Sequence, residues 1–239
     1  MTALKPAHRL DRLLYFVLAL IVAGIVVSGF SRTIGARLIH PPSPRPTVLY
    51  VHAAVFGSWI VLFITQTALI ATRNVKLHRK LGVLGLALGV SIPIIGVATA
   101  IVLGRLRVQH ADTTAASSLV LSLFDMIAFT VPFGLAVYWR TKPDFHRRLM
   151  LLATCALTSA AIGRLIPQSW PDEWIYIGVD ALILFGVGWD LIATRRLHLV
   201  YRYGLPTLLF GQTIAIYLDV SGSPHWLAIA HRLIGQSSP

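Results

Sequence analysis

The class of fold is decided by residues 13–30, which read LLYFVLALIVAGIVVSGF and contain no charged side chain. A helix needs roughly 20 predominantly apolar residues to cross the hydrocarbon core of a bilayer. Over the whole chain of 239 residues, 56% are hydrophobic and 13% are charged, which is more apolar surface than a soluble protein of this size can bury. The run is longer than the apolar core of a signal peptide, so we interpret it as the first span of a membrane protein.

Six further apolar stretches follow along the chain. In the lipid core every backbone amide must be bonded within the protein, and these runs are too long and too uniformly apolar for the alternating strands of a barrel. The sequence therefore predicts an all-α bundle, a single transmembrane domain of residues 1–239 that crosses the bilayer seven times. The predicted spans are 13–31, 47–72, 81–104, 117–139, 147–166, 173–193 and 203–220. Residues 224–235 are too few to cross, and we predict that they lie along the interface.

The net charge of +12 comes from basic residues that lie in short clusters between the apolar stretches. This arrangement is typical of membrane orientation and not of a face that tracks nucleic-acid phosphates, so we expect no nucleic-acid partner. Fourteen of the 21 Lys and Arg residues fall at the N-terminus or in the connections after the second, fourth and sixth spans, and seven fall on the other side. Because basic loops stay in the cytoplasm, we predict a cytoplasmic N-terminus, an external C-terminus and, in a bacterium, insertion in the inner membrane.

Polar residues inside the spans are the first candidate site, because an ionisable group at membrane depth is costly and marks function. The predicted orientation places four such groups toward the outer face, namely His52, Asp125, Arg164 and Asp180. Gln66 lies two seven-residue steps after His52, on nearly the same helix face. Two interpretations stay open: a structural ion pair of Arg164 with Asp125 or Asp180, or a site for a substrate or a proton.

Histidines at the cytoplasmic ends of the spans are the second candidate site. His78 opens the third span, His146 opens the fifth, His198 precedes the seventh, and Asp190 ends the sixth. Together these four residues could bind a transition metal, and two histidines of neighbouring helices could instead bind a haem axially. The alternative is that the histidines are interfacial residues that contact lipid head groups. The single cysteine, Cys155, excludes an internal disulfide and a cysteine-based metal cage.

The motifs around these histidines resemble an uncharacterised family of bacterial multi-span membrane proteins. The resemblance runs from about residue 48 to the end of the chain and implies no activity. It rests on LHRKLG at 77–82, HRRLM at 146–150 and RRLH at 195–198, together with His52, Gln66 and Arg164.

A weaker resemblance is to the transmembrane cytochromes b that pass electrons from ascorbate across membranes. It implies a haem b held by His78 and His146 near the cytoplasmic face, and a second held near the outer face by His52 and a partner in the fourth span. The fourth span contains no histidine, and His110 lies in the loop before it.

Four functions therefore stand as hypotheses. The first, which we favour, is a haem protein that exchanges electrons, with quinone as a candidate partner. The second is a metal-dependent membrane protein that uses His78, His146, His198 and Asp190. The third is a proton-coupled transporter of a small molecule that uses the buried outer group, and the fourth is a non-catalytic factor that assembles with another complex. No nucleophile turn or zinc-protease motif points to a hydrolase.

Overall fold

The computed structural model describes residues 6–167 and 169–235, which fold into helices joined by short connections. No strand occurs in these residues, so the predicted all-α class is confirmed. In chain order the helices are α1 (Pro6–Ile34), which continues as a π-helical turn (Gly35–Ile39), α2 (Thr47–Ala71), α3 (Val75–Gln109), α4 (Leu119–Tyr138), α5 (Pro143–Ala156), α6 (Ser159–Ile162), α7 (Glu173–Thr194), α8 (Leu199–Ser221) and α9 (Pro224–Ile234).

Five of the described helical segments are long and apolar enough to cross a membrane. Large apolar side chains stand exposed along them, such as Val27, Val83 and Ile94, which are 67%, 72% and 63% exposed. Faces of this kind are unfavourable in water and ordinary in contact with lipid tails, so the chain is an integral membrane protein. The five segments are Leu13–Ile39, Thr47–Ala71, Val75–Gln109, Leu119–Tyr138 and Glu173–Ala193.

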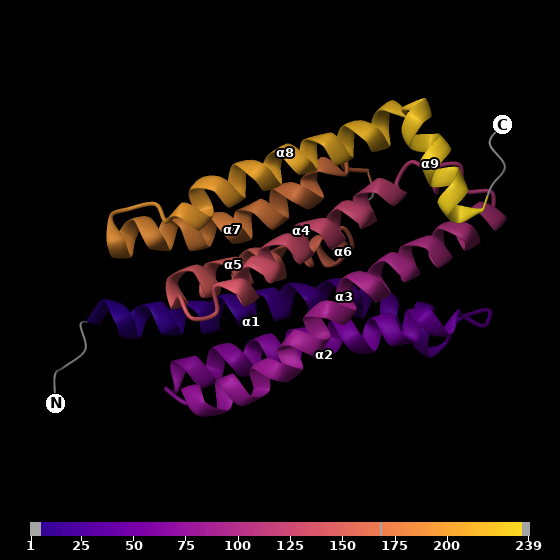
Figure 1. Cartoon of the computed structure of the whole chain (residues 1–239). Coiled ribbons are helices and arrows are strands. Elements are labelled where there is room, and N and C mark those ends of the chain that lie inside the picture. The colour runs from indigo at the N-terminus through magenta and orange to yellow at the C-terminus, as the bar shows by residue number, and fades with distance from the viewer. Residues whose placement is uncertain (1–5, 168, 236–239) are drawn as a thin grey trace.

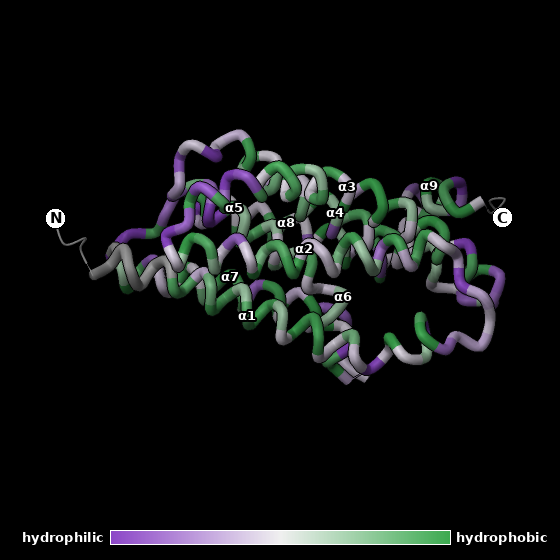
Figure 2. The backbone as a smooth tube through the Cα atoms, turned by 90° about the horizontal axis from the view of Figure 1, so that it is seen from below, coloured by the Kyte–Doolittle hydropathy of each residue, from purple (hydrophilic) through white to green (hydrophobic). Residues whose placement is uncertain are grey.

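The helices run back and forth between two ends of an elongated bundle (Figure 1). The start of α1 lies at one end, together with the α2–α3, α4–α5 and α7–α8 connections. The α1–α2 and α3–α4 connections lie at the other end, where α9 crosses the bundle. We name these the inner end and the outer end, after the predicted orientation. Figure 2 shows hydrophilic residues concentrated at the two ends and hydrophobic residues between them.

Helix α4 lies in the middle of the bundle, between α3, α5 and α8. On one side it packs aromatic residues against α2, where Trp59 meets the rings of Phe129 and Phe133 edge-on at 5.2 and 5.7 Å between centroids. A second core, centred on Leu151 and Ile183, joins α1, α5, α7 and α8. Since both cores are buried apolar clusters, they hold the polar residues described below in fixed positions.

The predicted interfacial segment forms helix α9, which packs across the outer ends of α3 and α4. Its Ile234 and Ala230 join a small apolar cluster with Ala116, and the indole nitrogen of Trp226 donates to the carbonyl of Ser117 at 3.0 Å. The helix is therefore attached to the α3–α4 connection, which borders the cavity described below.

The fifth predicted span is not one continuous helix. It breaks at Leu157 and Thr158, and after α6 the chain turns through residues 163–166. The hydroxyl of Thr158 donates back to the carbonyl of Cys155 at 2.6 Å, a local bond that competes with helix continuation. The break was not predicted from the sequence, because most of the residues around it are as apolar and small as those of a regular membrane helix.

The short helix α6 lies directly against α1. A Cβ atom added at Gly29 would lie 2.4 Å from the carbonyl oxygen of Ala161, a distance that no side chain tolerates. Glycine at this position therefore lets the two backbones touch, as small residues do between membrane helices. This contact fixes the depth at which α6 presents Ser159.

Candidate functional site

A cavity of about 500 Å³ opens at the outer end, among α1, α4, α6, α7 and the α3–α4 connection. Its size falls within the range of small-molecule sites in proteins. Charged and hydroxyl side chains line it beside apolar ones. The lining includes Thr33, Arg37, Arg107, Leu121, Asp125, Ser159, Arg164, Ile166, Asp172, Ile175 and Tyr176.

Asp125 lies about two helical turns in from the outer end of α4, one of the helices long and apolar enough to cross a membrane. The hydroxyl of Ser159 donates to its Oδ2 at 2.5 Å, and the hydroxyl of Tyr176 donates to its Oδ1 at 3.3 Å. Among the described residues, no cationic group lies within ion-pair distance of this carboxyl group. Asp125 is partly buried. A partly buried carboxylate without a cation is destabilised, and a bound proton removes that cost.

Arg164 lies in the turn after α6 and is partly buried. Its Nε donates to the hydroxyl of Thr33 at 3.2 Å, its Nη1 donates to the carbonyl of Ala160, and its guanidinium group lies 4.3 Å over the ring of Phe30. Within the part of the chain that the structure describes, no carboxylate lies within ion-pair distance of it. The interpretation of Arg164 as half of a structural ion pair with Asp125 or Asp180 is therefore wrong.

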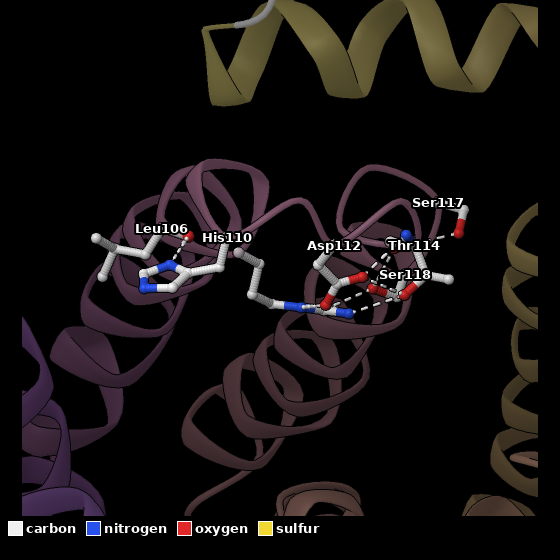
Figure 3. Close-up of polar contacts among 7 residues, drawn as sticks. Leu106, His110, Asp112, Thr114, Ser117 and Ser118 are labelled. Atoms are coloured by element: carbon white, nitrogen blue, oxygen red, sulfur yellow. Dashed lines mark hydrogen bonds and ion pairs between the residues drawn. The ribbon is translucent and has the colours of Figure 1, made fainter. Parts of the chain in front are cut away.

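Arg107 borders the same cavity, and its charge is compensated. Its Nε donates to Oδ2 of Asp112 at 2.7 Å, and its two terminal nitrogens donate to the hydroxyls of Ser118 and Thr114 at 2.8 and 3.0 Å. Figure 3 shows Asp112, Thr114 and Ser118 drawn together by these bonds. The bonds from Arg107 and then Thr114 hold the pKa of Asp112 at about 2, so the pair stays ionised at physiological pH. Arg107 therefore organises the rim of the cavity.

Three of the five residues predicted for the outer site do not line this cavity, although His52 lies within range of the charge of Arg164. His52 stacks on Phe56 in α2, with 3.9 Å between ring centroids. Asp180 of α7 accepts a bond from the side-chain amide of Gln212 at 3.0 Å. Gln66 lies near the inner end of α2, and its buried Oε1 finds no partner in the described part of the chain.

The structure thus brings Asp125 and Arg164 to one cavity and adds residues that the sequence did not single out. In the sequence, Arg37 is one of the basic residues between the apolar stretches. Ser159 and Tyr176 lie within apolar spans, where single serine and tyrosine residues are common and do not indicate a site. The neighbouring polar pair at 158–159 in an apolar run was the available signal for the helix break.

The inner histidines divide into a pair and a helix cap. The rings of His78 and His146 lie 6.4 Å apart between centroids, and Nδ1 of His146 lies 2.9 Å from the carbonyl of Ala136. His198 caps α8 instead, where its Nδ1 accepts the amide of Val200 at 3.2 Å. Burial, followed by the positive charge of Arg148, lowers the pKa of His198, which keeps this nitrogen free to accept the bond.

Asp190 accepts two bonds from Arg148, at 2.7 Å from Nε and 2.6 Å from Nη2. Of the four residues predicted for an inner metal site, the structure therefore brings only His78 and His146 together. In residues 6–167 and 169–235, no group of three or more His, Cys, Asp or Glu side chains could hold a metal ion.

His110, which precedes the fourth helix, is the C-cap residue of α3. Nδ1 of His110 lies 2.7 Å from the carbonyl of Leu106 in its own helix, as Figure 3 shows, so the ring is held at the outer end of α3. Comparison of the chain with protein-family models, with curated proteins and with solved structures finds no match.

Proposed function

We propose that this chain is a multi-pass carrier of the inner membrane, which takes a small anion into the outer cavity and moves it together with a proton. The single observation that supports this function is the unpaired Arg164. A guanidinium group held partly buried beside a cavity, without a carboxylate in the described residues, needs a negative partner. An anionic solute is the partner that a cavity can admit.

The proposed topology has seven crossings. Helix α8 contains 23 residues, which at 1.5 Å per residue gives about 34 Å, enough for the roughly 30 Å core of a bilayer. Helix α5 with 14 residues is too short alone, and α6 continues its path toward the outer end. The basic residues of the α2–α3, α4–α5 and α7–α8 connections gather at the inner end, which supports a cytoplasmic N-terminus.

Asp125 is the proposed proton site. Its carboxyl group lines the same cavity as Arg164, and the groups that donate to it, from Ser159 and Tyr176, are neutral hydroxyls. A proton on this carboxyl group leaves Arg164 free for the incoming anion, whereas an ionised Asp125 competes with that anion. Proton binding and anion binding therefore favour each other, which is the coupling that a symporter requires.

The helix break supports transport as well. In secondary transporters, solute and coupling ions bind where membrane helices are interrupted, because the interruption exposes polar groups at membrane depth. Here the interruption at Leu157 and Thr158 places Ser159 against Asp125. One wall of the cavity is therefore a segment that can shift without unwinding a whole helix.

Uptake into proteoliposomes tests this function. With an inward proton gradient, we expect the full chain to accelerate uptake of at least one of three labelled probes: lactate, phosphate and chloride. Arg164→Gln should lower the initial rate about tenfold or more, because the charge-assisted bonds to the anion are lost. Arg232→Gln, an exposed arginine on α9, is the matched control and should leave the rate unchanged. Rates equal to those of protein-free vesicles for all three probes would overturn the proposal.

A haem-binding redox protein is the second candidate, carried by the pair His78 and His146. Two imidazoles on one metal ion, with metal–nitrogen bonds of about 2 Å, put their ring centres roughly 6 Å apart, close to the observed 6.4 Å. The bond between His146 and the carbonyl of Ala136 leaves Nε2 free as a ligand, as is usual for metal-binding histidines. Bound haem would supply one-electron chemistry, with a quinone in the lipid as the expected partner.

An absorption spectrum of protein purified after growth with haem supplied tests this candidate. The expected result is a Soret band that His146→Ala removes and His231→Ala, on α9, leaves unchanged. Colourless protein without stoichiometric metal by elemental analysis would rule out both haem and a bare transition metal at this pair.

A further inference from the structure

We infer that the anion which fits the outer cavity is a small organic monocarboxylate, bound with its carboxylate on Arg164 and its hydrocarbon part on the apolar wall. This inference rests on the proposed function, since it names the substrate class of the same cavity. It is carried by three observations: the net charge of the lining, the unused donors of Arg164 and the apolar side chains opposite them.

The charges that line the cavity favour an anion with a single charge. Arg107 is neutralised by Asp112, and a protonated Asp125 contributes none. Arg37 and Arg164 share the lining with the exposed Asp172, and none of these three has an ion-pair partner among the described residues. One positive charge remains in excess. A monoanion balances it, whereas a phosphate dianion or a tricarboxylate would bring uncompensated negative charge against Asp172.

The geometry of Arg164 favours a carboxylate over a spherical ion. A guanidinium group has five N–H donors, and the bonds to Thr33 and Ala160 use two of them. The ring of Phe30 covers one face of the group and leaves its edge as the available surface. Two parallel N–H donors along an edge match the two oxygens of a carboxylate, which gives the strongest form of this contact.

The remaining lining accommodates a hydrocarbon chain. Leu121 of α4, Ile166 after α6 and Ile175 of α7 contribute apolar side chains to the same cavity. Inorganic anions gain nothing from these contacts, while each methylene group removed from water is worth about 0.8 kcal/mol. The cavity of about 500 Å³ is large enough for a short carboxylic acid.

Calorimetric titration of the purified full chain in detergent micelles tests the inference. The probes are sodium butyrate, its uncharged analogue butyramide, sodium phosphate and sodium citrate. We expect butyrate to bind about tenfold or more tightly than each of the other three. Arg164→Gln should abolish the preference for butyrate over butyramide, and Arg232→Gln should preserve it.

Arg164→Lys keeps the positive charge without the planar fork, and so separates a carboxylate contact from simple charge attraction. We expect Arg164→Lys to weaken butyrate binding at least several-fold. The same variant replaces Arg164→Gln in the test if Arg164→Gln fails to fold. If phosphate or citrate binds in a manner that depends on Arg164 and butyrate does not bind, the proposed substrate class is wrong. The proposal of an anion carrier would remain valid. The absence of binding by every anion would overturn both proposals. Equal binding of butyrate and butyramide would show that the cavity recognises only the hydrocarbon part of the ligand, and would contradict the carboxylate contact with Arg164.

Discussion

Replacing Asp190 with alanine should lower the free energy of unfolding by about 3–5 kcal/mol, the usual cost of leaving one partner of a buried ion pair uncompensated. Arg148 and Asp190 are each 3% exposed, and two short bonds join them between α5 and α7. Without the Asp190 carboxylate, the guanidinium group would keep a buried charge. Its contacts with Asp144 would remain, at 2.7 Å to the carbonyl and 3.5 Å to the exposed carboxylate, and they compensate that charge only in part. The measurement is the denaturation midpoint in detergent micelles.

Asp144→Ala provides the matched control for this variant. The Asp144 side chain is 68% exposed and contacts Arg147 at 2.8 Å and Arg148 at 3.5 Å, so its removal should cost less than about 1 kcal/mol. The double variant Arg148→Met with Asp190→Leu removes both charges and should recover most of the loss. A destabilisation of Asp190→Ala no larger than that of Asp144→Ala would show that the pair contributes little.

Replacing Asp125 with asparagine should abolish proton entry while anion exchange across the vesicle membrane persists. Asparagine has the size of aspartate. Its Oδ1 can accept the bond from one of the two hydroxyls of Ser159 and Tyr176, and its amide nitrogen can donate to the other, but it binds no proton in this range of pH. Proton entry is measured with the pH-sensitive dye pyranine enclosed in proteoliposomes. Anion exchange is measured separately, with labelled lactate on both sides of the vesicle membrane. We expect the pyranine signal to fall to that of protein-free vesicles and exchange to change by less than about threefold.

Asp180→Asn is the control that shows whether the effect is specific to Asp125 or follows from replacing any aspartate within a membrane-spanning helix. Asp180 is bonded by Gln212 between α7 and α8 and does not line the cavity. Both activities should stay at the level of the unmodified chain. If Asp125→Asn still couples proton entry to anion uptake, the assignment of the proton to Asp125 is wrong.

The positions of the helices could be predicted from sequence because the lipid core imposes a length and an apolar composition on each of them. Predicted spans such as 47–72 and 117–139 agree within two residues with α2 (Thr47–Ala71) and α4 (Leu119–Tyr138). The fifth span differs because hydropathy averages over side chains, whereas the break at Thr158 depends on one hydrogen bond from a side-chain hydroxyl to the backbone and on the contact of Gly29 with Ala161.

Side-chain partners were much less predictable, because similar depth in the membrane does not imply contact. Asp125, Asp180 and Arg164 were expected at similar depth, and each has a different set of partners. His198 shares the inner end with His78 and His146 but belongs to the cap of α8. Rotation of each helix about its axis decides such contacts, and the uniform apolar composition of these spans leaves that rotation poorly specified.

The glycine contact between α1 and α6 also links distant parts of the chain mechanically. Because backbone touches backbone at Gly29 and Ala161, no intervening side chain can change rotamer to absorb a displacement. A tilt of the first helix is therefore transmitted to Ser159, two residues before Ala161, and through its hydroxyl to Asp125. We therefore expect a displacement of α1 at Gly29 to reach the carboxyl group of Asp125 through one backbone contact and one hydrogen bond.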